Sequence, residues 1–314
     1  MKALVTGCAG FIGSTLTDRL LEDGYEVIGI DRFSDYYARD LKEQNIASAV
    51  KNPHFTLLEE DILGMERFPL VDYVFHLAAQ AGVRASWGKS FAIYTRDNIQ
   101  ATQQLLEFYR DQEIRKFVYS SSSSVYGDVA LPMREDQRVQ PVSPYGVTKL
   151  AAEHLCSLYG KNYGVPIVSL RYFTVYGPRQ RPDMGINRFV RAILNGEPIT
   201  IYGDGNQTRD FTYIDDAVEA NLLAAMSDAR GEVFNIGGGN RISVIELVRA
   251  IEAATGKTAH IRHIGEQKGD VQDTWADTGK AEKVLGWQPK VGIKEGLKSY
   301  YAGITSNHVL DGPL

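Results

Sequence analysis

"TGCAGFIG", Thr6 to Gly13, is the stretch that decides the fold. It follows a short apolar run, "KALV", and precedes an amphipathic stretch, so Gly7, Gly10 and Gly13 stand between a predicted strand and a predicted helix. Glycines in this place permit a tight turn and let the backbone approach a pyrophosphate, which the free N–H groups of the helix N-terminus stabilise. The alternative for such a motif alone is a glycine-rich turn that binds nothing.

Asp31 ends the second predicted strand, eighteen positions after Gly13. An acid in this position accepts hydrogen bonds from an adenosine ribose, and its charge repels a 2′-phosphate, which favours NAD over NADP. Arg32 follows directly and works against that preference. An Asp at a strand end is also a common turn or cap residue, so its position and spacing together carry the prediction.

Short apolar runs alternate with longer amphipathic stretches over the first half of the chain. Strands are predicted over 2–7, 25–31, 54–61, 72–79, 115–123 and 166–173, with helices such as 14–24 and 99–112 between them. This alternation predicts an α/β fold, a doubly wound parallel (Rossmann) sheet with a smaller mixed α/β substrate-binding lobe. We expect residues 1–176 and 210–237 to form the NAD-binding domain, and 177–209 and 238–314 the nucleotide-sugar-binding lobe.

Composition excludes several classes of function. The 314 residues are 44% hydrophobic and 23% charged, enough to bury a large core, and the formal net charge of −5 offers no basic surface for nucleic acid. Two cysteines and six scattered histidines predict neither a disulfide framework nor a metal site. No signal peptide and no apolar run of about 18 residues is found. We expect a soluble cytoplasmic protein without a membrane span.

Tyr145 and Lys149 in "SPYGVTKLAAEHL" lie on one face of a predicted helix, because residues at i and i+4 are neighbours there. A free phenol ionises near pH ~10, so a tyrosine base near neutral pH needs its pKa lowered by about 3, or about 4 kcal/mol. One cation about 4 Å away at an effective dielectric of about 20 supplies about 4 kcal/mol. The charge of Lys149 is therefore large enough to activate Tyr145, and an oxidised nicotinamide nearby would add to it, although a Tyr and a Lys often share a helix face by chance.

Together these pieces resemble the extended short-chain dehydrogenase/reductase family, in particular its NAD-dependent nucleotide-sugar epimerases and dehydratases. The resemblance covers essentially the whole chain. It rests on "TGCAGFIG", "HLAAQAGVR", "DNIQAT", "SSSSSVYGD", "SPYGVTK", "RYFTVYGPRQRPDM", "GDGNQTRDFTYIDD", "FNIGGG" and "TWADTGKAEKVLGWQP" in this order. The family places a catalytic hydroxyl three residues before the Val of "VYG", which is Ser122 here.

The resemblance implies a set of NAD-binding residues. They are Gly7, Gly10, Phe11, Ile12 and Gly13 at the pyrophosphate, Asp31 at the ribose, Asp61 and Ile62 at the adenine, Leu77, Ala78, Ala79 and Asn98 along the cofactor, Lys149 and Tyr145 at the nicotinamide ribose, and Tyr172 beside the ring. It also implies a mechanism in which Tyr145 removes the proton from the sugar hydroxyl at carbon 4, Ser122 hydrogen-bonds the same oxygen, and hydride passes to NAD, leaving a transient 4-keto sugar.

Ser123 and Ser124 depart from two branches of the family. Dehydratases place an acid after the catalytic hydroxyl, and UDP-glucuronate decarboxylases usually carry a Glu just before "VYG". Two neutral donors can instead hold a carboxylate on carbon 5 of the sugar, although serines at a strand end also bond to nearby backbone. Thr174 in "YFTVYGPRQRPDM" would face the same carboxylate, where galactose epimerases usually have Asn; this stretch is very similar to UDP-glucuronate 4-epimerases.

The nucleotide diphosphate needs a cationic anchor, and the resemblance implies several residues for it. Arg84, Arg181 and Arg209 are expected to clamp the diphosphate, with solvated surface arginines as the alternative. Asn187, Arg188, Thr200, Tyr202 and Gln207 are further expected in the nucleotide pocket. Where many relatives read Arg-Pro-Gly-Asp, this chain reads Gln-Lys-Gly-Asp, so Asp270 is retained for the uridine ribose but the usual arginine is absent.

The sequence therefore favours epimerisation at carbon 4 of UDP-glucuronic acid to UDP-galacturonic acid. UDP-glucuronate decarboxylase and UDP-galactose 4-epimerase remain alternatives, and a non-catalytic NAD-binding sensor is disfavoured because Ser122, Tyr145 and Lys149 are all present. A homodimer formed through 98–110 and 145–160 is also expected, although an apolar helix face packs equally well inside a monomer.

Overall fold

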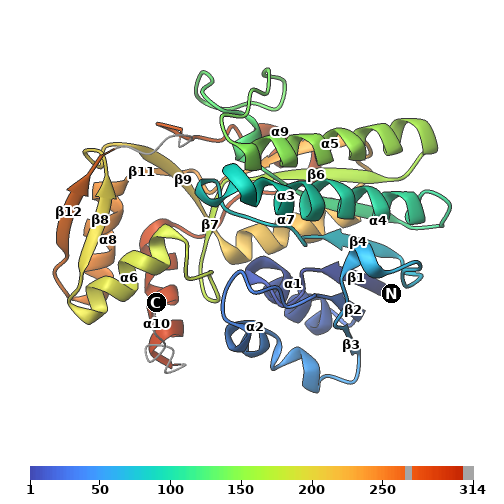
Figure 1. Cartoon of the computed structure of the whole chain (residues 1–314), viewed down its shortest axis with the longest axis horizontal. Coiled ribbons are helices and arrows are strands. Elements are labelled where there is room, and N and C mark those ends of the chain that lie inside the picture. Colours follow the sequence, from blue (N-terminus) through green and yellow to red (C-terminus); the bar gives the residue numbers. More distant parts are fainter. Residues whose placement is uncertain (266–270, 307–314) are drawn as a thin grey trace.

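A seven-stranded parallel sheet forms the centre of the larger part of the molecule (Figure 1). The computed structural model describes residues 1–265 and 271–306. The strand order is β10 (Glu232–Ile236), β6 (Ile167–Tyr172), β5 (Lys116–Ser122), β4 (Tyr73–His76), β1 (Lys2–Thr6), β2 (Glu26–Ile30) and β3 (Phe55–Leu58). The order reverses between β1 and β4, and ligands of open parallel sheets bind at such a reversal.

Helices cover both faces of this sheet, which is why its strands are apolar on both sides. On one face lie α1 (Phe11–Glu22), α2 (Arg39–Ile46) and α7 (Ile214–Met226); on the other lie α3 (Phe91–Tyr94), the π-helical η5 (Thr95–Gln100), α4 (Ala101–Tyr109) and α5 (Pro144–Tyr163). Short 3-10 turns connect them: η1 (Ala49–Lys51), η2 (Ile62–Gly64), η3 (Arg84–Ser86), η4 (Gly88–Ser90) and η6 (Ser123–Val125).

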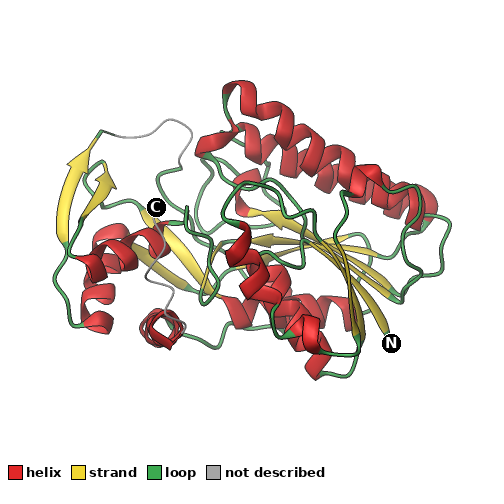
Figure 2. Ribbon diagram, turned by 60° about the horizontal axis from the view of Figure 1, so that its bottom comes forward, coloured by secondary structure: helices red, strands yellow, loops and turns green. Residues whose placement is uncertain are grey.

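The smaller part of the molecule lies beyond the carboxyl ends of the large sheet (Figure 2). It contains α6 (Gly185–Asn195), α8 (Val244–Thr255), α10 (Ile293–Ser306) and the two-stranded parallel sheet of β8 (Pro198–Tyr202) and β12 (His260–Ile264), while α9 (Gly279–Leu285) packs near β10. A three-stranded sheet, β11 (Asn240–Ser243), β9 (Thr208–Tyr213) and β7 (Thr174–Tyr176), connects the two parts.

The α/β fold with a parallel sheet and smaller mixed sheets is confirmed, and each of the six predicted strands is present within the predicted range. The division at residues 176, 209 and 237 stays a prediction. The three-stranded sheet pairs β7, on the predicted NAD-binding side, with β9, which spans the boundary at 209, and β9 with β11 from the other lobe.

The glycine motif joins β1 to α1 in a turn that admits no side chain at Gly13. A Cβ added at Gly13 would lie 2.1 Å from the carbonyl oxygen of Gly7. The helix begins after Gly10 with no side-chain cap and no acidic residue in its first turn. Its first N–H groups therefore face the end of the sheet without competition from a side chain.

Candidate active site

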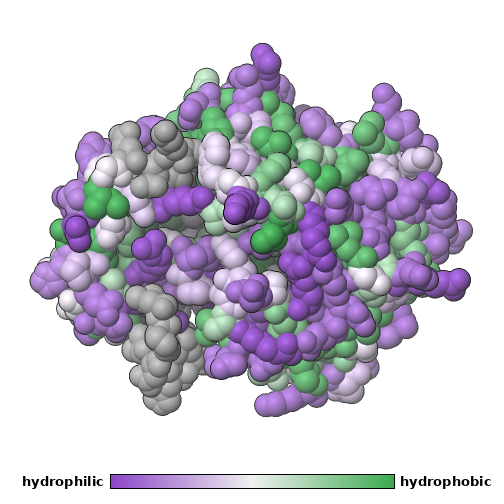
Figure 3. Space-filling view, viewed as in Figure 1, coloured by the Kyte–Doolittle hydropathy of each residue, from purple (hydrophilic) through white to green (hydrophobic). Residues whose placement is uncertain are grey.

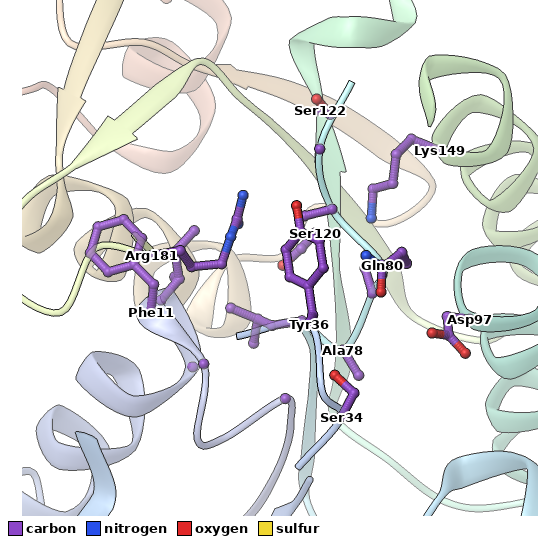
Figure 4. A pocket seen from close by; sticks show the side chains of 18 of the residues that line it. Phe11, Ser34, Tyr36, Ala78, Gln80, Asp97, Ser120, Ser122, Lys149 and Arg181 are labelled. Carbon is purple, nitrogen blue, oxygen red and sulfur yellow. The ribbon is translucent and has the colours of Figure 1, made fainter. Parts of the chain in front are cut away.

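A cavity of about 420 Å³ lies at the carboxyl ends of β1, β2, β4, β5 and β6 (Figure 4). It runs from Ser122 and Lys149 at one end to Ser34 and Asp97 at the other, and Arg181 reaches in from the side of Phe11. We call these the catalytic end and the adenosine end. The predicted residues that line the cavity are Gly7, Gly10, Phe11, Ile12, Gly13, Asp31, Asp61, Ile62, Leu77, Ala78, Ala79, Ser122, Ser123, Ser124, Tyr145, Lys149, Tyr172, Thr174 and Arg181.

The catalytic end joins the last residues of β5 to the first turn of α5. Ser122 ends β5, and its hydroxyl accepts a hydrogen bond from the N–H of Ser124 at 3.1 Å, which caps η6. Ser143 caps α5 by accepting from the N–H of Gly146 at 3.1 Å. A Cβ on Gly146 would lie 2.3 Å from the carbonyl oxygen of Ser124. Only glycine therefore lets the helix that carries Tyr145 pack directly against the serine run.

Tyr145 and Lys149 lie one helical turn apart on α5, and the activation of Tyr145 by Lys149 together with an oxidised nicotinamide stays a prediction. Burial raises the pKa of Tyr145, and the opposing influences are a hydrogen bond with Ser122 and the charge of Arg181. Burial also lowers the pKa of Lys149 to about 8, with Cys156 and then Glu153 opposing it. The Lys149 ammonium instead lies 4.6 Å from the centre of the Tyr119 ring.

A buried hydrogen-bond chain begins below the glycine motif. Thr6 Oγ1 bonds His76 Nδ1 at 2.8 Å, and His76 Nε2 bonds Thr102 Oγ1 at 2.9 Å. Burial lowers the pKa of His76 to about 3, so the ring is neutral. The hydroxyl proton of Thr102 is donated to the carbonyl oxygen of Asn98 at 2.7 Å. Thr102 therefore accepts from His76, which makes His76 the Nε2–H tautomer.

The same chain of hydrogen bonds continues to the backbone of Tyr145. The Asn98 amide donates to Thr148 Oγ1 at 2.9 Å, and Thr148 donates to the carbonyl oxygen of Tyr145 at 2.8 Å. Asn98 also donates to the Gln80 carbonyl at 3.0 Å and accepts from its N–H at 2.7 Å. Asn98 was predicted to run along the cofactor. It is buried behind the cavity wall instead, where it fixes the backbone of Gln80, a lining residue in the loop after β4.

An ion pair lies buried behind the serine run. Arg171 Nη2 is 2.5 Å from Glu153 Oε1, and the two side chains are only 5% and 6% exposed. Ser121 donates to the other carboxylate oxygen of Glu153 at 2.6 Å, and the Arg171 guanidinium lies 4.7 Å from the centre of the Tyr126 ring. The charge behind the catalytic end is therefore paired and hydrogen-bonded, as a buried charge must be.

Arg181 lies where the loop after β7 meets the loop after β2. It pairs with Asp183 at 3.0 Å, and Asp183 accepts a hydrogen bond from the Tyr36 hydroxyl at 3.1 Å. Tyr36 and Arg181 both line the cavity. The loop that begins at Phe33 is thereby tied to the smaller lobe across the cavity.

Other residues predicted to bind the nucleotide lie in or beside the smaller lobe, outside the lining of this cavity among the described residues. The Arg84 guanidinium lies 4.0 Å from the centre of the Tyr202 ring, so these two predicted residues are brought together. Gln207 donates to the Tyr202 carbonyl at 2.8 Å, and Asn187 to the Gln180 carbonyl at 2.8 Å.

Of the other four residues predicted for the nucleotide pocket, the three that the structure describes are also absent from the lining of this cavity. Arg188 is exposed on α6, and Thr200 is half-buried on β8. Arg209 donates to the carbonyl oxygens of Thr208 and Gln272 at 2.8 and 2.9 Å. Asp270 lies outside the described residues.

Several lining residues were not predicted from the sequence. They are Ile30, Arg32, Ser34, Tyr36, Tyr37, Lys42, Glu60, Gln80, Ala81, Gly82, Val83, Asp97, Ala101, Ser120, Ser121, Phe173, Val175 and Met184. Most follow directly after strands at the carboxyl edge of the sheet, which is the general position of ligands in open α/β folds. Their position directly after predicted strands is the feature of the sequence from which they could have been predicted.

Comparison with known proteins assigns the family. Residues 3–237 match the model of the NAD dependent epimerase/dehydratase family. The chain belongs to this family. It is 45% identical to an uncharacterized UDP-glucose epimerase, YtcB, of Bacillus subtilis over 98% of both chains, and 42% identical to the UDP-glucuronate 4-epimerase of Thermodesulfobacterium geofontis over 94% of this chain and 93% of that one.

A solved member of the family has the same fold. The UDP-glucuronic acid 4-epimerase of Bacillus cereus, in complex with UDP-glucuronic acid and NAD, superposes with a TM-score of 0.94 at 46% identity, over 98% of this chain and 100% of that one. NAD is the cofactor of the family, and the cavity fits it. The uncapped N-terminus of α1 lines the cavity beside the three glycines, as a pyrophosphate requires.

Proposed function

We propose that this protein epimerises carbon 4 of UDP-glucuronic acid to give UDP-galacturonic acid. The chain is an NAD-dependent nucleotide-sugar 4-epimerase, an isomerase. The finer assignment concerns the sugar, because relatives named for UDP-glucose and for UDP-glucuronate stand at similar identity.

One observation carries the choice of a sugar with a carboxylate. The carboxylates in the cavity lining are Asp31 after β2, Glu60 and Asp61 after β3, and Asp97 on η5. Asp97 lies at the adenosine end (Figure 4), and Asp61 joins it there through Arg32. The lining of the catalytic end instead offers hydroxyls from Ser122, Ser123, Ser124 and Thr174, and beside them the guanidinium of Arg181, which pairs with Asp183 outside the lining. Neutral donors and a cation favour an anionic group by charge-assisted hydrogen bonds, whereas a nearby acid would repel it.

The chain's own residues perform the proton chemistry. Tyr145 takes the proton of the hydroxyl on carbon 4, and Ser122 hydrogen-bonds the same oxygen and the phenol. NAD, when bound, accepts and returns the hydride at carbon 4. Tyr145 accepts this proton as the phenolate. Burial raises its pKa, whereas the hydrogen bond with Ser122 and the charge of Arg181 favour the phenolate, and the positive charge of an oxidised nicotinamide would favour it further. The phenol formed in this way returns the proton to the carbon-4 oxygen when the ketone is reduced. Lys149, with its pKa near 8, lies one helical turn away on the same face.

The serine hydroxyls keep the reaction from losing carbon dioxide. A 4-keto sugar with a carboxylate on carbon 5 decarboxylates when the breaking bond aligns with the π-system of the ketone. Ser123, Ser124 and Thr174 hold the carboxylate so that this bond stays near the plane of the ketone. Turning the ring over while the nucleotide stays anchored then presents the opposite face of carbon 4, which inverts the centre.

The test is proton NMR of the purified protein with UDP-glucuronic acid and no added cofactor, with the Tyr145→Phe variant as control. Growth of UDP-galacturonic acid signals without a pentose product is expected. Carbon dioxide with a UDP-pentose would instead make the protein a decarboxylase. No conversion of UDP-glucuronic acid, together with interconversion of UDP-glucose and UDP-galactose, would support the second candidate that the name of the Bacillus subtilis relative suggests.

A homodimer through α4 and α5 is part of this proposal. On α5, Val147, Leu158 and Tyr163 are 46%, 52% and 55% exposed, and on α3 Phe91 and Ile93 are also exposed. Figure 3 shows hydrophobic residues among hydrophilic ones on the face that carries these helices. Light scattering should give twice the 34.9 kDa mass of the chain. Particles of one chain mass would rule the dimer out.

Residues 1–265 and 271–306 contain no helix that is long and apolar enough to cross a bilayer.

A further inference from the structure

Arg32 lies at the adenosine end between two carboxylates that come from other parts of the chain. Its Nη1 atom is 3.3 Å from Asp61 Oδ2, after β3, and its Nη2 atom is 2.5 Å from Asp97 Oδ2, on η5. Arg96 pairs with the same two carboxylates, at 2.7 Å from Asp97 Oδ1 and also with Asp61 Oδ2. Two guanidinium groups and two carboxylates thus form one closed network with no net charge.

Two members of this network, Arg96 and Asp97, lie in the π-helical η5. Arg96 and Asp97 are adjacent in η5, yet both side chains reach the Arg32–Asp61 pair. π-Helical turns occur mostly as short insertions at functional sites. Asp97 is the more buried carboxylate of the network. Its side chain is 12% exposed, whereas those of Arg32 and Asp61 are 31% and 32% exposed. The pair of Arg32 with Asp97 is therefore the best shielded contact of the network, and the least weakened by solvent.

Arg32 follows Asp31, where a guanidinium would otherwise be well placed for a ribose 2′-phosphate. Asp31 itself is held by backbone donors, since its two oxygens accept from the N–H groups of Phe33 at 2.8 Å and Ala9 at 3.1 Å. The neighbouring cation of Lys42 donates to the carbonyl oxygen of Ser34 at 2.5 Å and to its hydroxyl at 3.2 Å. Both cations beside the ribose position are thus engaged by groups of the chain.

We propose that Asp61 and Asp97 act as specificity-determining residues for the cofactor, because they hold Arg32 away from a 2′-phosphate. Selection for NAD then has two parts. Asp31 repels the 2′-phosphate directly. The ion pair with Asp97 keeps the guanidinium of Arg32, the residue after Asp31, from binding that phosphate. Arg32 therefore has a structural role in this chain and does not bind a cofactor phosphate.

The test measures dissociation constants of NADH and NADPH by nicotinamide fluorescence, on purified full-length protein freed of bound nucleotide, for the wild type, Asp97→Asn, Arg32→Ala and the double variant. Asp97→Asn should lower the ratio of the NADPH to the NADH constant about tenfold, the effect of one gained charge-assisted hydrogen bond. Arg32→Ala should leave the wild-type ratio within about twofold, yet cancel the gain in the Asp97→Asn background.

Glu60→Gln is the matched control for net charge. Glu60 is an exposed carboxylate in the same lining, and its substitution removes one negative charge while leaving Asp61 and Asp97 on Arg32. It should change the ratio by less than about threefold. A change equal to that of Asp97→Asn would mean that net charge sets the preference, and would overturn the proposal.

Two further results would overturn it: an unchanged ratio in folded Asp97→Asn, and a tenfold loss of NADPH binding in Arg32→Ala alone. Circular dichroism melts establish that each variant is folded. If Asp97→Asn does not fold, Arg96→Gln replaces it, because it leaves both carboxylates to Arg32 alone. The ratio should then rise, and a fall would contradict the proposal. Cofactor binding is measured without any sugar, so the result is independent of the substrate.

Discussion

The two ends of the cavity handle charge in opposite ways. At the adenosine end, Arg32, Asp61, Arg96 and Asp97 form ion pairs in a network that is partly open to solvent. At the catalytic end, burial lowers the pKa of Lys149 and raises that of Tyr145, so both groups are driven toward their neutral forms. Paired charges suit the recognition of a cofactor. The pKa of Lys149 lies near the pH at which the protein works, so this group changes protonation state at little cost, whereas Tyr145 needs positive charge in the loaded site to reach its phenolate form.

Tyr145→Phe should give the largest loss of activity of the variants at the catalytic end. The variant removes the proton acceptor but keeps the ring, which packs against Tyr94 with 6.2 Å between ring centres. We expect kcat to fall about a thousandfold, within the usual contribution of general acid–base catalysis. Progress curves with the nucleotide sugar measure the rate, and circular dichroism melts establish that the variant is folded. A residual rate above a tenth of the wild type would remove Tyr145 from the role of base.

Glu153→Gln tests how much the buried ion pair behind the catalytic end contributes to the free energy of unfolding. The variant leaves the Arg171 guanidinium buried without a carboxylate, so the free energy of unfolding should fall by about 3 to 5 kcal/mol. Glu26→Gln is the matched control, because Glu26 pairs with Lys2 at 2.9 Å with both side chains about half exposed, and it should change stability by less than about 1 kcal/mol. Urea unfolding measures both. Equal losses would contradict the distinction between buried and surface charge.

Lys149→Met should raise stability while it lowers activity. Burial lowers the pKa of Lys149 from 10.5 to about 8, so between these values the unfolded chain binds more protons than the folded one and stability rises with pH. Below pH 8 the full penalty is present, roughly 3 kcal/mol. The variant should therefore be more stable than the wild type at pH 7, with the difference shrinking toward pH 10. Thermal unfolding at both pH values measures this, and a difference independent of pH would contradict it.

Ser124→Ala gives the smallest expected effect and sharpens the assignment of the sugar. Loss of one hydrogen bond to a carboxylate should raise KM for UDP-glucuronic acid about tenfold. The KM for UDP-glucose should change less than twofold, because that sugar has no carboxylate. NMR of the products should also show some UDP-pentose, since the carboxylate is held less firmly. An equal rise in both KM values would place Ser124 away from carbon 5.

The sequence was sufficient where local pattern and position determine the structure. β5, predicted over 115–123, is found at Lys116–Ser122, and the glycine motif joins β1 to α1 as expected. The lining contains the predicted Ser122, Tyr145 and Lys149 because parallel strands end at one edge of the sheet.

Long-range electrostatics could not be predicted in the same way. The partners of Arg32 lie 29 and 65 positions away in the sequence, and no local pattern marks them. The burial of Tyr145 and Lys149 could not be predicted either. The sequence argument counted the attraction of a cation but not the burial that raises the pKa of Tyr145 and lowers that of Lys149, because burial depends on the packing of the whole site.

The edge strand β10 sets the order in which a growing chain can complete this fold. β10 pairs in parallel with β6, yet 59 residues separate Tyr172 at the end of β6 from Glu232 at the start of β10. Until residue 236 has left the ribosome, β6 remains an open sheet edge with unpaired backbone groups, and such edges are prone to pair with other chains. The smaller lobe's first segment, α6 and β8, is synthesised within that interval. Synthesis thus supplies the first part of the smaller lobe before the seven-stranded sheet is finished.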